Sequence, residues 1–107
     1  MAFKVKFSER ASDDINDIIE YINNELCSPK AAEKLYIAVS DKIELLRDNP
    51  YLFPLYHDER LSAEGYRFAV VGNYLIFYII DDSNSTVNIV RVLYGRRNIP
   101  AIIEPER

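Results

Sequence analysis

The densest group of side chains able to do chemistry lies in the segment Arg91–Asn98, which reads RVLYGRRN and holds three arginines within seven positions. Guanidinium groups bind carboxylates and phosphates through paired hydrogen bonds, so such a cluster suits an acidic protein segment or a nucleic-acid phosphate. Arg91 lies inside an apolar run, whereas Arg96 and Arg97 follow that run. We therefore interpret Arg96 and Arg97 as a binding surface, to which Arg67 and Arg91 could contribute.

Arg91 also has a structural interpretation. Because it lies within an apolar, strand-like run, its side chain could pair with a carboxylate on a helix packed against the sheet. Asp14 and Glu44 are the candidate partners. Such a pair would hold two layers together rather than bind a partner, and both interpretations of Arg91 stay open at this point.

Two other reactive side chains have no evident catalytic partner. His57 is the only histidine and follows Tyr56 in a segment without periodicity, where a general base is conceivable but an exposed loop histidine is favoured. Cys27 is the only cysteine, so no internal disulfide can form, and we interpret it as a partly buried small side chain. The chain has no phosphate-binding glycine loop, no His/Cys metal spacing and no nucleophile elbow, so no cofactor and no metal is implied.

The composition predicts one globular domain over residues 1–107. No apolar stretch is long enough to span a membrane and no signal peptide is evident, so we expect a cytoplasmic protein. The net charge is −4, which disfavours general binding to nucleic acid. The charge is uneven: residues 1–65 carry 8 basic and 13 acidic side chains, and residues 66–107 carry 5 and 4. A local basic patch on an acidic body is therefore expected.

The N-terminal half of the chain is predicted to form two helices. Residues 8–26 have apolar side chains at spacings of three and four, and Ser8 or Ser12 can cap the start. Residues 27–50 repeat that pattern, with Ser28 as N-cap and Pro29 as first residue. The break between the segments is short, which predicts an antiparallel hairpin. The expected inward stripes are Ala11, Ile15, Ile18, Ile19, Ile22 and Leu26, then Ala32, Leu35, Val39, Ile43 and Leu46.

Four strands complete the predicted domain. Residues 3–7 alternate apolar and basic side chains, residues 66–80 form two strands around a Gly72-Asn73 turn with positive φ angles, and residues 86–94 form the last strand. We interpret residues 51–65 as a loop and the tail as one short helical turn. The order predicts an α+β fold: an N-terminal strand, a helical hairpin and a three-stranded antiparallel meander, with both helices packed on one four-stranded sheet.

These segments resemble, in order, the RelE/ParE family of toxins from bacterial type II toxin–antitoxin systems. FSERASDDINDIIEYI resembles the first helix of the family, and PKAAEKL and IELLRDNPYLFP resemble the second helix and the proline loop after it. YRFAVVGNYLIFYII and VNIVRVLYGRRN resemble the last three strands. The resemblance covers nearly the whole chain and implies either ribosome-dependent mRNA cleavage, as in RelE-like members, or poisoning of DNA gyrase, as in ParE-like members.

The groups that an RNA-cleaving member uses are mostly missing here. Metal-free cleavage needs side chains that activate the 2′-hydroxyl, stabilise the phosphorane and protonate the leaving oxygen. The resemblance places five such groups on the sheet and tail, of which Arg67 and Arg97 fill two. The other three positions hold Ala69, Leu75 and Ile103. For a nuclease, the catalytic candidates are therefore Arg67, Arg97, His57 and Tyr94.

The ending VLYGRRN resembles that of ParE-like members, and we therefore favour gyrase over the ribosome and mRNA as the target. The resemblance further implies a cognate antitoxin, and contact with operator DNA only through that antitoxin. We expect the target or the antitoxin to bind Arg67, Arg91, Tyr94, Arg96 and Arg97. We expect the antitoxin to bind the open face of the sheet and its edge, by strand addition or as a helix laid in a groove. A non-toxic member that only binds its antitoxin stays as an alternative.

Overall fold

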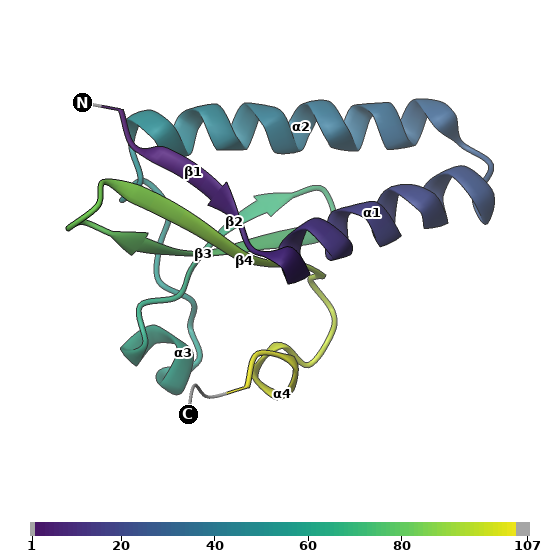
Figure 1. Cartoon of the computed structure of the whole chain (residues 1–107). Coiled ribbons are helices and arrows are strands. Elements are labelled where there is room, and N and C mark those ends of the chain that lie inside the picture. The colour runs from purple at the N-terminus through teal and green to yellow at the C-terminus, as the bar shows by residue number, and fades with distance from the viewer. Residues whose placement is uncertain (1, 105–107) are drawn as a thin grey trace.

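A four-stranded sheet separates two layers of helix in the computed structural model, which describes residues 2–104 (Figure 1). The two long helices cover one face, and two short helices lie against the other. No helix among these residues is long and apolar enough to cross a membrane. The elements are β1 (Lys4–Phe7), α1 (Glu9–Asn24), α2 (Pro29–Asp48), α3 (Glu59–Ala63), β2 (Arg67–Val71), β3 (Tyr74–Asp81), β4 (Thr86–Tyr94) and α4 (Ile99–Ile102).

The strand order is β1-β4-β3-β2, and the predicted antiparallel meander of β2, β3 and β4 is confirmed. The first and last strands pair in parallel, from Lys4 opposite Thr86 to Phe7 opposite Ile89. This pairing was not predicted, because strand periodicity carries no information about direction. A parallel pair needs a long crossover connection, and the helical hairpin provides most of it. The sheet is therefore mixed.

The ends of the two long helices agree with the sequence prediction in some respects and differ in others. The Ser8 side chain accepts a hydrogen bond from the Ala11 backbone N–H at 3.0 Å, so Ser8 caps α1 as predicted. Ser28 is the N-cap residue of α2 and Pro29 its first residue, as predicted, but the Ser28 side chain forms no capping hydrogen bond. Leu26 and Cys27 were wrongly predicted to be buried or partly buried. Both are exposed in the link between the helices, where Cys27 has a positive φ of 48°.

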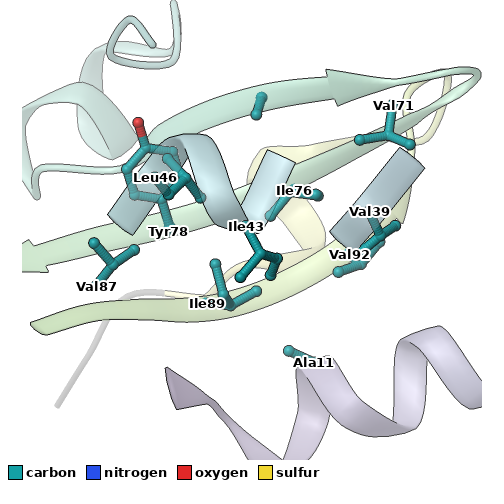
Figure 2. Close-up of a cluster of buried hydrophobic side chains, with 11 residues drawn as sticks. Ala11, Val39, Ile43, Leu46, Val71, Ile76, Tyr78, Val87, Ile89 and Val92 are labelled. Atoms are coloured by element: carbon teal, nitrogen blue, oxygen red, sulfur yellow. The ribbon is translucent and has the colours of Figure 1, made fainter. Parts of the chain in front are cut away.

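The main hydrophobic core lies between the helical hairpin and the sheet (Figure 2). Ala11 of α1 and three residues of α2 point at the sheet, at the spacings that the apolar stripes predicted. Leu46 and Ile76 are fully buried, and Tyr78 is fully buried beneath α2. The buried members are Ala11, Val39, Ile43, Leu46, Ala69, Val71, Ile76, Tyr78, Val87, Ile89 and Val92.

The opposite face of the sheet is covered, which corrects the expected open face. A second core forms there from Tyr56, Leu61, Tyr66, Phe77, Leu93, Ile99 and Ile103. The prediction of a loop over residues 51–65 was wrong for α3, which begins because the Asp58 carboxylate accepts a hydrogen bond from the Leu61 N–H at 3.0 Å. One guanidinium joins the two short helices. Arg60 donates hydrogen bonds to the carbonyls of Pro100, at 3.0 Å, and Ile103.

The turn between β2 and β3 brings the ends of three strands to one edge of the molecule. Gly72 has a φ of 56°, the left-handed conformation that a two-residue hairpin requires. Asn73 was predicted to share this conformation, but it is not among the residues with positive φ. The turn therefore needs a glycine at only one position, because only Gly72 adopts a positive φ. Val71 pairs directly with Tyr74 across the turn.

Tyr78 makes the stability of this fold sensitive to alkali. Its hydroxyl donates a hydrogen bond to the Pro50 carbonyl at 2.8 Å, and burial raises its pKa to about 12. The folded state therefore retains a proton that the unfolded chain releases near pH 10, so stability present below pH 10 is lost as the pH rises towards 12. We expect this loss to reach about 2–3 kcal/mol. Urea unfolding between pH 8 and 12 would measure it.

The control for this prediction is Tyr78→Phe. This variant should cost about 1 kcal/mol at pH 8, because the Pro50 carbonyl loses its donor, and it should show a smaller decline above pH 10. An equal alkaline decline in both proteins would assign the effect to other tyrosines.

Candidate functional site

Arg96 and Arg97 lie in an exposed turn directly after β4, which we call the arginine turn (Tyr94–Asn98). Two backbone hydrogen bonds hold it. The Gly95 N–H donates to the Asn73 carbonyl at 2.9 Å, and the Arg97 N–H donates to the Tyr94 carbonyl at 3.1 Å. Neither arginine forms an ion pair with any residue between 2 and 104. No ion pair with residues 2–104 therefore occupies either guanidinium group.

Gly95 is the residue that lets the arginine turn approach the neighbouring hairpin. A Cβ at this position would lie 3.3 Å from the Asn73 carbonyl oxygen, closer than most side chains approach backbone. The turn is thus fixed against a rigid part of the sheet, which limits how far the two arginines can move when a partner binds.

Arg91 pairs with Asp14, one of its two predicted partners, and not with Glu44. The Arg91 Nε and Nη2 atoms donate to the two oxygens of the Asp14 carboxylate at 2.8 and 2.9 Å. The side chains are only 13% and 14% exposed, and the hydrogen bonds raise the pKa of Arg91. Glu44 instead lies 3.5 Å from Arg47 on the surface of α2. The geometry therefore gives Arg91 a structural contact that joins α1 to the sheet.

The same carboxylate covers an edge of the sheet that β1 leaves open. Pairing between β1 and β4 ends at Ile89, and β4 continues to Tyr94. Beyond that point the Ser8 hydroxyl donates to the Val90 carbonyl at 2.8 Å, and Asp14 accepts from the Val92 N–H at 3.0 Å. The first turns of α1 thus replace a missing strand neighbour along β4.

Arg67 does not lie with the arginine turn. It begins β2 and pairs with Tyr78, which is four residues along β3 from Tyr74, or about 13 Å. Its guanidinium donates to the Phe53 carbonyl at 2.6 Å and lies 4.9 Å from the ring centre of Tyr51. Tyr51 in turn donates to Asp82, a hydrogen bond that raises the pKa of Tyr51. These contacts fasten the loop after α2 to the sheet.

The four side chains proposed for a nuclease are not gathered in one place. His57 is exposed in the loop before α3, with its ring centre 4.2 Å from that of Tyr56. Arg67 is near this loop, because its strand bridges to Leu55. Tyr94 and Arg97 lie at the other end of the sheet, beside the β2–β3 turn. The positions of the missing groups are apolar: Ala69 and Ile103 are buried, and Leu75 packs against the second core.

Two tyrosines that the sequence did not single out, Tyr21 and Tyr74, lie near Tyr94 of the arginine turn. Tyr94 lies opposite Tyr74 in the sheet, with ring centres 5.9 Å apart and planes at 69°. Tyr21 of α1 completes this tyrosine cluster (Tyr21, Tyr74, Tyr94). Burial, and then the neighbouring Tyr21 and Tyr94, raise the pKa of Tyr74. No local signal in the sequence brings these three residues together, because they come from a helix and two strands.

An apolar groove of about 300 Å³ lies between α1 and α2. Phe7 and Tyr36 line it and are 37% and 65% exposed. Most of its other walls are aliphatic, from Ile15, Ile18, Ile19, Leu35, Val39, Ile43 and Val92. We call it the helical groove. Among residues 2–104 no group of three His, Cys, Asp or Glu side chains is arranged to hold a metal ion.

Comparison with known proteins identifies relatives of the whole arrangement. The sequence model described as "ParE toxin of type II toxin-antitoxin system, parDE" matches residues 5–99. No curated protein compared with the chain matches it.

Solved structures with a similar fold are toxin–antitoxin proteins. The chromosomal ParDE system of Pseudomonas aeruginosa superimposes with a TM-score of 0.68 at 14% identity, over 87% of this chain and 96% of that one. The RelBE2 complex of Mycobacterium tuberculosis gives 0.57 at 25% identity, over 88% and 99%. The Escherichia coli RelBE complex gives 0.58 at 15% identity, over 90% and 100%. The fold predicted from the order of elements is confirmed.

Proposed function

Because this chain belongs to the ParE toxin family of type II toxin–antitoxin systems, we propose that it arrests growth by acting on DNA gyrase and that a cognate antitoxin neutralises it. The observation that carries the choice of target is the match of residues 5–99 to the ParE family. The arginine turn is the surface proposed to meet gyrase, since Arg96 and Arg97 are exposed and free of ion pairs with residues 2–104. Residues 1–107 act as one domain in this proposal.

Two further observations support gyrase over the ribosome. The nuclease positions filled by Ala69 and Ile103 are buried apolar sites, so no proton-transfer group can stand there without disturbing the core. The net charge of −4 also opposes approach to ribosomal RNA, whose phosphates repel an acidic body. The toxin in this proposal binds its target and needs no cofactor.

A supercoiling assay tests the proposal. Purified gyrase should lose supercoiling activity, or accumulate cleaved DNA, when the toxin is added, and the antitoxin should restore activity. A folded toxin that leaves gyrase unaffected but causes mRNA cleavage in a translation extract would favour the RelE-like alternative. A folded chain that affects neither system, and does not arrest growth, would be a non-toxic member that binds only its antitoxin.

The helical groove is the proposed docking site of the antitoxin. The similar structures from P. aeruginosa, M. tuberculosis and E. coli are toxin–antitoxin systems or complexes. The groove offers aliphatic walls and two exposed aromatic side chains, Phe7 and Tyr36, which suit the apolar face of an amphipathic helix. The face of the sheet is not available for this purpose, because α3 and α4 cover it.

Substitution of Tyr36 by glutamate should weaken antitoxin binding at least tenfold. A charge in the groove would have to be desolvated, at a cost of about 1.4 kcal/mol or more. The matched control is Ile37→Glu, since Ile37 is also exposed on α2 but does not line the groove. Titration calorimetry would measure both affinities. Equal losses in the two variants would contradict a docking site in the groove.

A further inference from the structure

The tyrosine cluster forms an exposed aromatic step beside the arginine turn. Tyr21 and Tyr94 are 51% and 39% exposed, and Tyr74 is half-buried. The edge-to-face contact between Tyr74 and Tyr94 fixes both rings, so they lose little side-chain freedom when a partner covers them. Tyrosine and arginine are the residue types that most often dominate the energy of a protein interface.

Backbone contacts place this cluster next to Arg96 and Arg97. Tyr94 is the first residue of the arginine turn, and its carbonyl accepts a hydrogen bond from the Arg97 N–H. Tyr74 follows Asn73, whose carbonyl accepts from the Gly95 N–H. The tyrosine cluster and the two arginines therefore lie at the same corner of the sheet.

The other side of the aromatic step is acidic. Tyr21 also lines a shallow hollow on α1 whose remaining walls are Asp17, Glu20, Asn24 and Glu25. Tyr21 is thus shared by the tyrosine cluster and the hollow. Across this corner the surface changes from basic, at Arg96 and Arg97, through aromatic to acidic.

We propose that Tyr21, Tyr74 and Tyr94 anchor the target, and that the bound part of the target is a protein segment with a large apolar side chain between an acidic and a basic end. This proposal rests on the toxin function proposed above and specifies the surface that carries it. An acidic end of the segment meets Arg96 and Arg97, and the apolar side chain meets the tyrosines. The basic end meets the carboxylates of the α1 hollow.

Charge complementarity selects a protein over a nucleic acid. A nucleic-acid strand carries phosphates along its whole length, so a strand that reached Arg96 would also bring phosphates to Asp17 and Glu20. Repulsion at the acidic end would offset the attraction at the basic end. A protein segment can present opposite charges at its two ends.

Alanine substitution tests the anchor. Tyr21 lies on an exposed face of α1, so Tyr21→Ala removes its ring and preserves the helix. Tyr94→Ala removes the other exposed ring. Each should raise the toxin concentration for half-maximal gyrase inhibition about tenfold or more, with a matching loss of growth arrest in cells. The control is Ile37→Ala, which removes an exposed apolar side chain from α2. Unchanged gyrase inhibition and growth arrest in both tyrosine variants would overturn the anchor.

A charge reversal identifies the class of target. Asp17→Lys combined with Glu20→Lys should weaken growth arrest if the acidic hollow meets the basic end of a protein segment. Stronger growth arrest in this variant would indicate a nucleic-acid target and overturn the proposal.

Two outcomes separate this inference from the choice of gyrase. If the wild-type chain arrests growth without inhibiting gyrase, and Tyr21→Ala abolishes the arrest, the anchor stands and gyrase is not the target. If the wild-type chain neither arrests growth nor inhibits gyrase, both proposals fail. Circular dichroism melting of every variant separates loss of binding from loss of folding.

Discussion

Replacement of Arg96 and Arg97 by alanine is expected to abolish growth arrest and leave the fold intact. Both side chains are exposed and make no ion pair with residues 2–104, so their removal breaks no contact of the core. A charge-assisted hydrogen bond contributes about 1.5–3 kcal/mol. Loss of two such bonds should raise the concentration for gyrase inhibition roughly 100-fold or more.

The control for this prediction is Lys4→Ala with Lys6→Ala. It also removes two exposed positive charges, but from β1, where Lys4 lies opposite Thr86 at the far end of β4. Growth curves after induction, with toxin levels matched by immunoblot, would compare the two variants. Full toxicity of the arginine variant would remove the arginine turn from the mechanism, and equal loss in both variants would point to net charge alone.

Replacement of Asp14 by alanine is expected to destabilise the fold by about 3 kcal/mol. The change leaves the Arg91 guanidinium, which is mostly buried, without its counter-charge, and leaves the Val92 N–H without its acceptor. An unpaired buried charge costs far more than the pair contributes. Urea denaturation of the purified protein would measure the change in the free energy of unfolding.

Two further variants make this result specific. Glu44→Ala breaks the exposed pair with Arg47 and should cost less than about 0.5 kcal/mol. Asp14→Leu combined with Arg91→Met removes both charges and should recover much of the stability that Asp14→Ala loses. A double variant as unstable as Asp14→Ala would show that the ion pair is not the source of the effect.

Local patterns in the sequence were sufficient for the elements that depend on near neighbours. The apolar spacing of three and four residues located both long helices, and Gly72 located the hairpin because one positive φ angle decides that turn. The limits of β4, Thr86 and Tyr94, were also predicted correctly, because the apolar run of the strand is a local pattern. Asp14 was named in advance as a partner of Arg91, since a strand arginine and a helix carboxylate can meet across one layer.

Features that depend on distant parts of the chain were not predicted. The parallel pairing of β1 with β4 joins residues more than 80 positions apart, and α3 is too short for a periodic pattern. Arg67 was grouped with the other arginines on charge alone, although the predicted antiparallel order already places the start of β2 and the end of β4 at opposite ends of the sheet. The tyrosine cluster was not predicted because Tyr21 comes near enough to Tyr74 to raise its pKa only after α1 has packed on the sheet.

The parallel partnership of β1 with β4 also sets when the protein can fold. The first strand leaves the ribosome early, but Thr86 to Ile89, against which it pairs, are made near the end of synthesis. Closing so long a loop costs conformational entropy before the contacts between the two strands contribute any stability, and topologies of this kind fold slowly. Until then β1 has no partner strand, and α1 and α2 have only the β2–β3 hairpin to pack against. A chain that stops before residue 86 therefore cannot complete the sheet, because the partner strand of β1 is not yet made.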